Sequence, residues 1–104
     1  MPVTRINHFE AKKDTTRQLD AFMQEVVTRV KTLPGCRSVR LLHSIENNTH
    51  FAVVEEWDSI EAHQKAAANI PADQLKHAHE LVAGPPVGEY FQQLLALRPQ
   101  RSPV

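Results

Sequence analysis

The chain has 104 residues, of which 41% are hydrophobic and 23% are charged, as expected for one globular domain with a modest core. Lys plus Arg and Asp plus Glu number 12 each, so no basic excess is present to neutralise phosphates, and a nucleic-acid-binding protein is not expected. No apolar run approaches the roughly 18 residues of a membrane-spanning helix, so no membrane partner is expected either.

Two further features of the sequence bear on where the protein works. Residues 1–5 lack the apolar stretch of a secretory signal peptide. The single cysteine, Cys36, cannot form a disulfide within the chain, which suits a reducing compartment, and we expect a cytoplasmic protein. No metal site is expected, because the histidines on the predicted strands lack the spacing of zinc ligands. These histidines are His8, His43 and His50.

The first predicted element is a strand over residues 3–10 (VTRINHFE), which ends at the charged turn 11–14. A helix follows, because apolar residues then recur at helical spacing. These residues are Leu19, Phe22, Met23, Val26, Val27, Val30 and Leu33. One of residues 14–16 (DTT) can cap the start of the helix, and the Pro-Gly pair at 34–35 ends it.

Two strands are predicted next, over residues 38–45 (SVRLLHSI) and 50–57 (HFAVVEEW). The residues between them, 46–49 (ENNT), form a hairpin turn, since Asn tolerates the left-handed conformations that tight turns need. A helix then begins near Asp58 or Ser59, either of which can cap it.

This helical region is interrupted near Pro71, which fits the first turn of a second segment over residues 72–83 because its missing N–H is unpaired there anyway. The Gly-Pro-Pro sequence at 84–86 ends that segment. We expect the last strand over residues 87–97 (VGEYFQQLLAL) and a flexible tail over 98–104.

The order β-α-β-β-α-β predicts a ferredoxin-like α+β domain over residues 1–97, with a four-stranded antiparallel sheet and the helices on one face. Apolar side chains nevertheless occur on both faces of the strands. In the third strand, alternation along the chain separates Phe51, Val53 and Trp57 from Ala52 and Val54. Since no further helix is available to cover the second face, we expect a homodimer that packs sheet against sheet.

One segment resembles a known family. Residues 55–63 (EEWDSIEAH) follow a strand and open a helix, and they resemble the corresponding junction of the antibiotic biosynthesis monooxygenase family. Residues 33–36 (LPGC) and 83–86 (AGPP) fall where that family has similar segments, and the resemblance extends over about residues 2–97. It implies a dimeric α/β barrel made of two ferredoxin-like subunits. The family includes monooxygenases that act on aromatic polyketides or quinols without metal or flavin, haem-degrading enzymes and proteins of unknown activity.

Residues 1–8 (MPVTRINH) also resemble the first strand of the haem-degrading branch. In that branch an Asn at the position of Asn7, a Trp in the second helical region and a His further along that region surround the haem. An ungapped count from Trp57 places His77 at the position of the haem-ligating His, but the Trp position reads KAAA at 65–68. The resemblance therefore argues against haem cleavage and leaves haem as an alternative ligand.

The chemistry implied by the resemblance needs few protein groups. A deprotonated phenol or hydroquinone can reduce O₂ directly, so the protein must supply an apolar pocket, a base and a donor to the phenolate oxygen. We predict Asn7 as the donor and His77 or His79 as the base. Residues two apart on a helix point about 200° apart, so these histidines cannot share one metal ion. Helical periodicity groups His79 with Leu75 and Val82 on an inward face, whereas the family alignment selects His77, which we prefer.

Four apolar residues are predicted to line the pocket around a small aromatic molecule, although each also suits core packing. They are Phe9, Phe22, Val26 and Trp57. His63 is expected on the surface of its helix, and Glu55 and Glu56 alternate across the sheet and so form no carboxylate pair.

The sequence thus predicts a small monooxygenase that needs no cofactor and oxidises an aromatic or quinol-type substrate with O₂ between sheet and helices. The alternative is a protein that kept this fold without catalysis and holds haem or another planar ligand.

Overall fold

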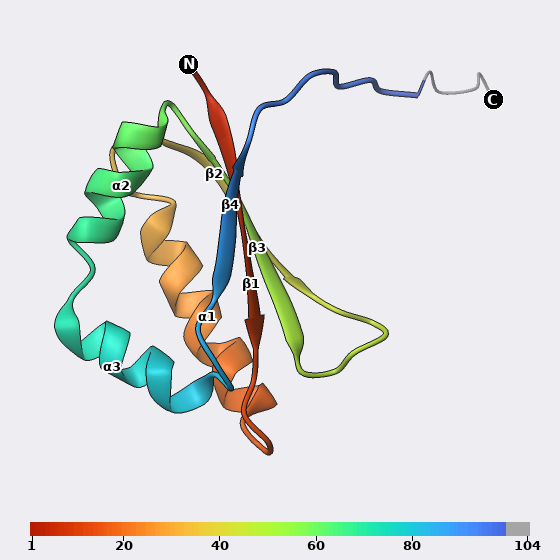
Figure 1. Ribbon diagram of the computed structural model, residues 1–104, viewed down its shortest axis with the longest axis vertical. Coiled ribbons are helices and arrows are strands. Elements are labelled where there is room, and N and C mark those ends of the chain that lie inside the picture. Colours follow the sequence, from red (N-terminus) through yellow and green to blue (C-terminus); the bar gives the residue numbers. More distant parts are fainter. Residues whose placement is uncertain (100–104) are drawn as a thin grey trace.

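Three helices cover one face of a four-stranded antiparallel sheet in the computed structural model, which describes residues 1–99 (Figure 1). The sheet order is β2-β3-β1-β4. The elements are β1 (Val3–Glu10), α1 (Thr16–Val30), β2 (Cys36–His43), β3 (His50–Trp57), α2 (Ile60–Ala68), α3 (Ala72–Leu81) and β4 (Val87–Phe91). The predicted ferredoxin-like α+β architecture is confirmed, and so is the break between the two later helical segments. None of the helices within residues 1–99 has the length and apolar character needed to cross a membrane.

The last strand is shorter than the prediction, which placed it over residues 87–97. β4 ends at Phe91, and residues 92–97 form no strand and leave the body on the side of the sheet away from the helices (Figure 1). Phe91 pairs with Thr4, near the start of β1, so a longer β4 would run past the end of its only neighbour. Of the tail predicted over residues 98–104, residues 100–104 lie outside the described part of the chain.

The second strand differs from the prediction at both of its ends. β2 begins at Cys36 and ends at His43, two residues earlier in each case than expected. A register shift between Cys36 and Ser38 extends the pairing with β3 back to Cys36. The turn is closed by Ser44, whose Oγ accepts hydrogen bonds from the backbone N–H groups of Glu46 and Asn47 at 3.2 and 2.9 Å.

Both ends of the first helix are held by specific contacts. The Oγ of Thr15, which precedes α1, donates to the carbonyls of Lys12 and Leu81 at 2.8 and 3.0 Å and so ties the start of α1 to the end of α3. After α1 the chain reverses at Gly35, whose φ of 86° lies in the left-handed region that favours glycine. A Cβ at this position would lie 2.7 Å from the Cβ of Ala62, so the same glycine lets α2 approach the turn.

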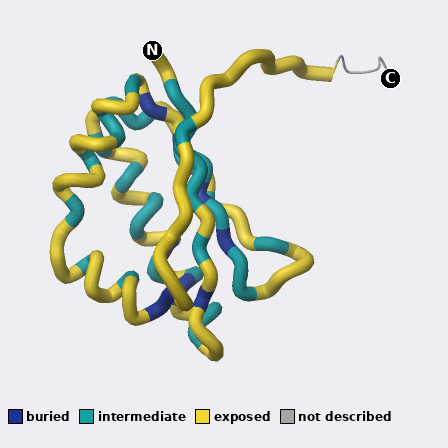
Figure 2. Tube along the Cα trace, viewed as in Figure 1, coloured by how far each residue is buried: buried dark blue, intermediate teal, exposed yellow. Residues whose placement is uncertain are grey.

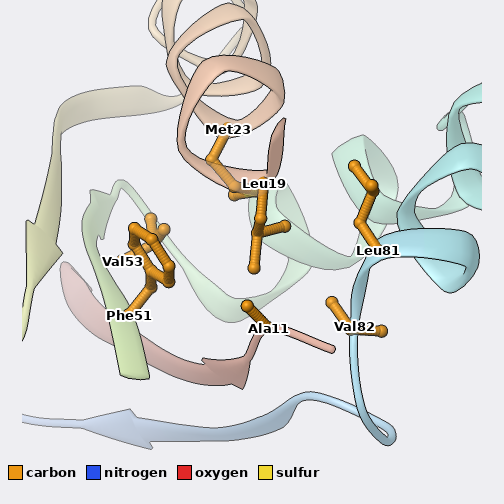
Figure 3. Close-up of a cluster of buried hydrophobic side chains, with 7 residues drawn as sticks. All are labelled: Ala11, Leu19, Met23, Phe51, Val53, Leu81 and Val82. Carbon is orange, nitrogen blue, oxygen red and sulfur yellow. The ribbon is translucent and has the colours of Figure 1, made fainter. Parts of the chain in front are cut away.

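The hydrophobic core lies between α1, the end of β1, the start of β3 and the end of α3 (Figure 3). Its largest fully buried members are Leu19 from α1 and Phe51 and Val53 from β3. Its other buried members are Ala11, Met23, Leu81 and Val82. In contrast, α2 has no buried residue and α3 has only one, so both helices are largely exposed or half-buried (Figure 2). α2 and α3 therefore do not pack tightly against the sheet.

Candidate active site

A cavity of about 690 Å³ lies between the sheet and the three helices. Its volume is within the ~300–1,000 Å³ typical of small-molecule sites. Apolar side chains make up most of its wall. They include Phe22, Val26 and Val30 from α1, Val53 and Trp57 from β3, and Ile70 and Leu75 from the α2–α3 region. Such a wall suits a planar hydrophobic ligand.

Five of the residues predicted for the site line this cavity together. The predicted donor Asn7 and the predicted lining residues Phe9, Phe22, Val26 and Trp57 all border it. Asn7 and Phe9 face the helices because alternate residues of β1 share that face, and Trp57 ends β3 on the same side.

The two histidines predicted as the base do not border the cavity. The inner side of α3 carries Gln74, Ala78 and Leu81, which are half-buried or buried, while His77 and His79 are exposed. The inward face predicted for His79 is wrong, because His79 is exposed and does not border the cavity, although Leu75, one helical turn before it, does.

His77 remains in contact with the outer edge of the site. Its ring meets Phe22 edge-on with centroids 4.8 Å apart, and its Nδ1 lies 3.6 Å from an oxygen of Glu80. It therefore packs behind a lining residue.

The polar end of the cavity is built on a row of residues across three strands. Arg5 of β1 stands opposite Glu55 of β3 on one side and Tyr90 of β4 on the other. The Nε of Arg5 donates to the Oδ1 of Asn7 at 3.2 Å, and its Cζ lies 4.5 Å from the centre of the Tyr90 ring. These two contacts hold the guanidinium beside β4.

His63 of α2 lies over this row and touches both of its ends. Its Nδ1 is 2.5 Å from the Tyr90 hydroxyl, and its Nε2 is 3.8 Å from Oε1 of Glu55. Burial lowers the pKa of His63, and the positive charge of Arg5 lowers it further. His63 is therefore neutral at pH 7, and its contact with Glu55 is not an ion pair there. A neutral imidazole that borders a cavity can accept a proton.

Glu55 is the one buried charged residue within residues 1–99, with 7% of its surface exposed. The Nε1 of Trp57 donates to its Oε1 at 2.9 Å. Burial raises the pKa of the Glu55 carboxyl, although the Trp57 hydrogen bond and the charge of Arg5 act in the opposite direction. Glu55 thus orients Trp57 and lies next to Nε2 of His63.

Gly88 leaves room for the polar end of the cavity. It pairs with Asn7 across the β1–β4 ladder. A Cβ at Gly88 would overlap the Oδ1 of Asn7 and the guanidinium of Arg5, so any larger residue would displace both groups.

Sequence reasoning placed His63 on the helix surface and did not select Arg5 or Tyr90. One signal was available: Arg5, Asn7 and Glu55 all fall on the inward face of their strands, where apolar residues are expected. Three polar residues on the face that is to be covered indicate a site.

The described residues do not form a metal or haem site. No group of three or more His, Cys, Asp or Glu side chains among residues 1–99 is placed to hold a metal ion. For haem, the histidine that the resemblance selects as the iron ligand, His77, does not border the cavity. That residue is therefore not placed to bind iron in this cavity.

The fold and the cavity together define a small ferredoxin-like protein with an internal, mostly apolar cavity. The sequence profile of the antibiotic biosynthesis monooxygenase family matches residues 2–81, and the chain belongs to that family. No curated protein sequence matches.

Solved structures of similar fold come from several bacteria. Rv0793 from Mycobacterium tuberculosis has a TM-score of 0.80 and 22% identity, over 94% of this chain and 100% of that one. SnoaB, a cofactor-independent oxygenase from Streptomyces nogalater, has a TM-score of 0.78 and 15% identity, over 92% and 96% of the two chains. PA3566 from Pseudomonas aeruginosa has a TM-score of 0.77 and 16% identity, over 90% and 95%. At these identities the likeness establishes the fold.

Proposed function

We propose that this protein is a cofactor-independent monooxygenase that oxidises a planar phenolic or quinol-type substrate with O₂ inside the cavity. The observation that carries the proposal is an apolar cavity of about 690 Å³ whose polar end holds a neutral histidine and the amide of Asn7. Family membership and the similarity in fold to SnoaB support it.

In the proposed reaction His63 is the base. With its proton on Nδ1, His63 donates to the Tyr90 oxygen and leaves Nε2 free to accept the phenolic proton of the substrate. The Oδ1 of Asn7 is held by Arg5, so its Nδ2 is the group that donates to the phenolate oxygen. His63 takes the place of His77 and His79 because it borders the cavity and they do not.

The phenolate then transfers one electron to O₂, and the resulting radicals combine to form a carbon–oxygen bond. Protonation by His63 and loss of the remaining C–H proton break the O–O bond. A ring CH₂ becomes C=O, one oxygen atom leaves as water, and the four electrons lost by carbon reduce O₂. The apolar wall keeps bulk water away from the intermediates.

Anthrone and ¹⁸O₂ provide the test. We expect oxygen uptake, anthraquinone containing one ¹⁸O, and a loss of about a hundredfold in kcat for His63→Gln. His77→Gln and His79→Gln, measured in parallel, should keep most of the rate. Absence of ¹⁸O in the product would contradict the proposal, and a loss confined to His77→Gln or His79→Gln would move the base to α3.

We also propose that the protein acts as a homodimer joined through the sheet face opposite the helices. Apolar residues of all four strands point to that face, namely Ile6, Leu42, Val54, Val87 and Phe91. The segment 92–97 leaves the body on that same side of the sheet (Figure 1), and its three leucines, Leu94, Leu95 and Leu97, are 90%, 73% and 80% exposed. A second copy would cover both surfaces.

Light scattering after gel filtration tests the dimer. The wild type should have twice the mass of the chain, whereas Val54→Asp, with a charge at the centre of the face, should be a folded monomer by circular dichroism. A monomeric wild type would contradict this proposal.

A further inference from the structure

We infer that the cavity selects a planar aromatic molecule that carries a carboxylate, and that Arg5 binds this carboxylate. The inference rests on the proposed function in taking the cavity as the substrate site, and it adds the chemical class of the substrate.

The first observation is the charge of the cavity wall. Arg5, Arg29 and Lys65 border the cavity, and Glu55 is the only acidic residue that does so within the described chain. The chain as a whole carries 12 residues of each sign, so this excess of positive charge is local. Arg29 and Lys65 are exposed, whereas Arg5 is half-buried. A ligand in this cavity therefore lies near one half-buried and two exposed positive charges.

The second observation is that Arg5 lacks an ion-pair partner. Glu55 stands directly opposite it in the β1–β3 register, yet no carboxylate oxygen within residues 1–99 lies within 4.0 Å of the guanidinium. Glu55 instead accepts the Trp57 hydrogen bond. Charged side chains removed from water are normally paired, so a guanidinium left unpaired in an apolar cavity lacks its counter-ion.

The third observation is the direction of the donors around Arg5. Its Nε is used by the Oδ1 of Asn7, and the ring of Tyr90 lies beside its Cζ. These contacts leave the two Nη groups of Arg5 as donors without a protein acceptor in the described residues. A planar pair of such donors matches the two oxygens of a carboxylate, while the Nδ2 of Asn7 serves the phenolate oxygen.

The apolar wall of the cavity and the guanidinium of Arg5 together favour the binding of an aromatic acid over that of a neutral aromatic molecule. The ring system fills the space between Phe22, Val26 and Trp57, and the carboxylate lies at Arg5. Charge-assisted hydrogen bonds of this kind are about twice as strong as neutral ones.

A matched pair of ligands tests the inference without turnover. The dissociation constants of 2-naphthoate and of the uncharged 2-naphthamide are measured by fluorescence titration of the full-length protein. We expect 2-naphthoate to bind about tenfold more tightly to the wild type. Arg5→Met should abolish this difference while 2-naphthamide still binds, which shows that the variant is folded. Arg17→Met, which removes an exposed arginine of α1 that does not border the cavity, should leave the ratio unchanged.

Equal affinity for the two ligands, a preference that survives in Arg5→Met, or failure of 2-naphthoate to bind would each overturn the inference. Oxygen uptake with anthrone separates this outcome from that of the proposed function. A carboxylate preference without ¹⁸O incorporation would leave the ligand class standing and remove the monooxygenase. Anthrone oxidation without a carboxylate preference would do the reverse.

Discussion

The hydroxyl of Tyr90 in the last strand lies 2.5 Å from Nδ1 of His63 in α2, so a short C-terminal strand fixes the ring of the one histidine that borders the cavity in the described chain. Tyr90 itself does not border the cavity. In the proposed reaction, Tyr90 accepts a hydrogen bond from the protonated Nδ1 of His63, which keeps Nε2 as the acceptor for the substrate proton. Tyr90 is thus a positioning residue.

We therefore expect Tyr90→Phe to lower kcat about fivefold with little change in KM, because one hydrogen bond of about 1 kcal/mol that orients the base is lost. The phenyl ring still packs beside Arg5, so 2-naphthamide binding should be retained. Steady-state oxygen uptake with anthrone measures both constants. An unchanged kcat would show that His63 needs no partner on Nδ1, and a change in KM alone would give Tyr90 a binding role instead.

The pH dependence of the reaction should reveal the charge next to His63. Burial and Arg5 both lower the pKa of this imidazole, while Glu55 and Tyr90 are the other ionisable groups that face it. His63 must be neutral to accept a proton, so kcat/KM should fall as the pH is lowered, and it should reach half its maximum at a pH below ~6.5, the ordinary histidine pKa.

Removing the charge of Arg5 should change the pH at which kcat/KM begins to fall. In Arg5→Met one cause of the lowered pKa is gone, so kcat/KM with the uncharged substrate anthrone should begin to fall at a higher pH than in the wild type. Arg17→Met is the matched control, since Arg17 is exposed on α1. Superimposable profiles for the wild type and Arg5→Met would mean that His63 is not the titrating base.

Glu55 should make stability depend on pH in a defined direction. Its pKa is raised in the folded state, so the folded protein binds more protons at this site than the unfolded chain does. The stabilising contribution is therefore present below the ordinary glutamate pKa of ~4.3 and is lost as the pH rises through the folded pKa. Glu55→Gln keeps an oxygen that can accept from Trp57 and removes the titration.

Urea unfolding of both proteins at about pH 4.5 and about pH 7 tests this. The free energy of unfolding of Glu55→Gln relative to the wild type should increase between the lower and the higher pH. Glu56→Gln, which changes the exposed neighbour on the other face of β3, is the control for a general change in charge. A difference that is equal at both pH values, or that decreases, contradicts the raised pKa.

The sequence predicted the fold well because its elements are set by local pattern, but only part of the site follows from such patterns. Strand alternation was enough to bring Asn7, Phe9 and Trp57 to one face. The end of β4 could not be predicted, since it depends on where β1 begins in the paired register. His63 faces inward because of how α2 lies over the sheet, and a nine-residue helix without a buried residue carries little trace of that orientation. The choice between His77 and His79 also missed the lining: the α3 residues that border the cavity are Gln74, Leu75 and Ala78, and only one of these is strongly apolar.

Gly88 has a role in the candidate site and little role in the fold. A Cβ at this position would overlap the Oδ1 of Asn7 and the guanidinium of Arg5, both of which belong to side chains that can move aside. Gly88→Ala should therefore fold, with a midpoint of thermal unfolding within a few degrees of the wild type, because alanine suits a strand at least as well as glycine. The displaced side chains should no longer present their donors to a ligand, so the preference for 2-naphthoate should be lost and the rate with anthrone should fall about tenfold, as expected when a donor to the developing charge is misplaced. Gly84→Ala is the matched control, since a Cβ at Gly84 meets nothing within 4 Å. If Gly88→Ala kept both the ligand preference and the rate, the Arg5–Asn7 pair could not be the part of the cavity that binds the substrate.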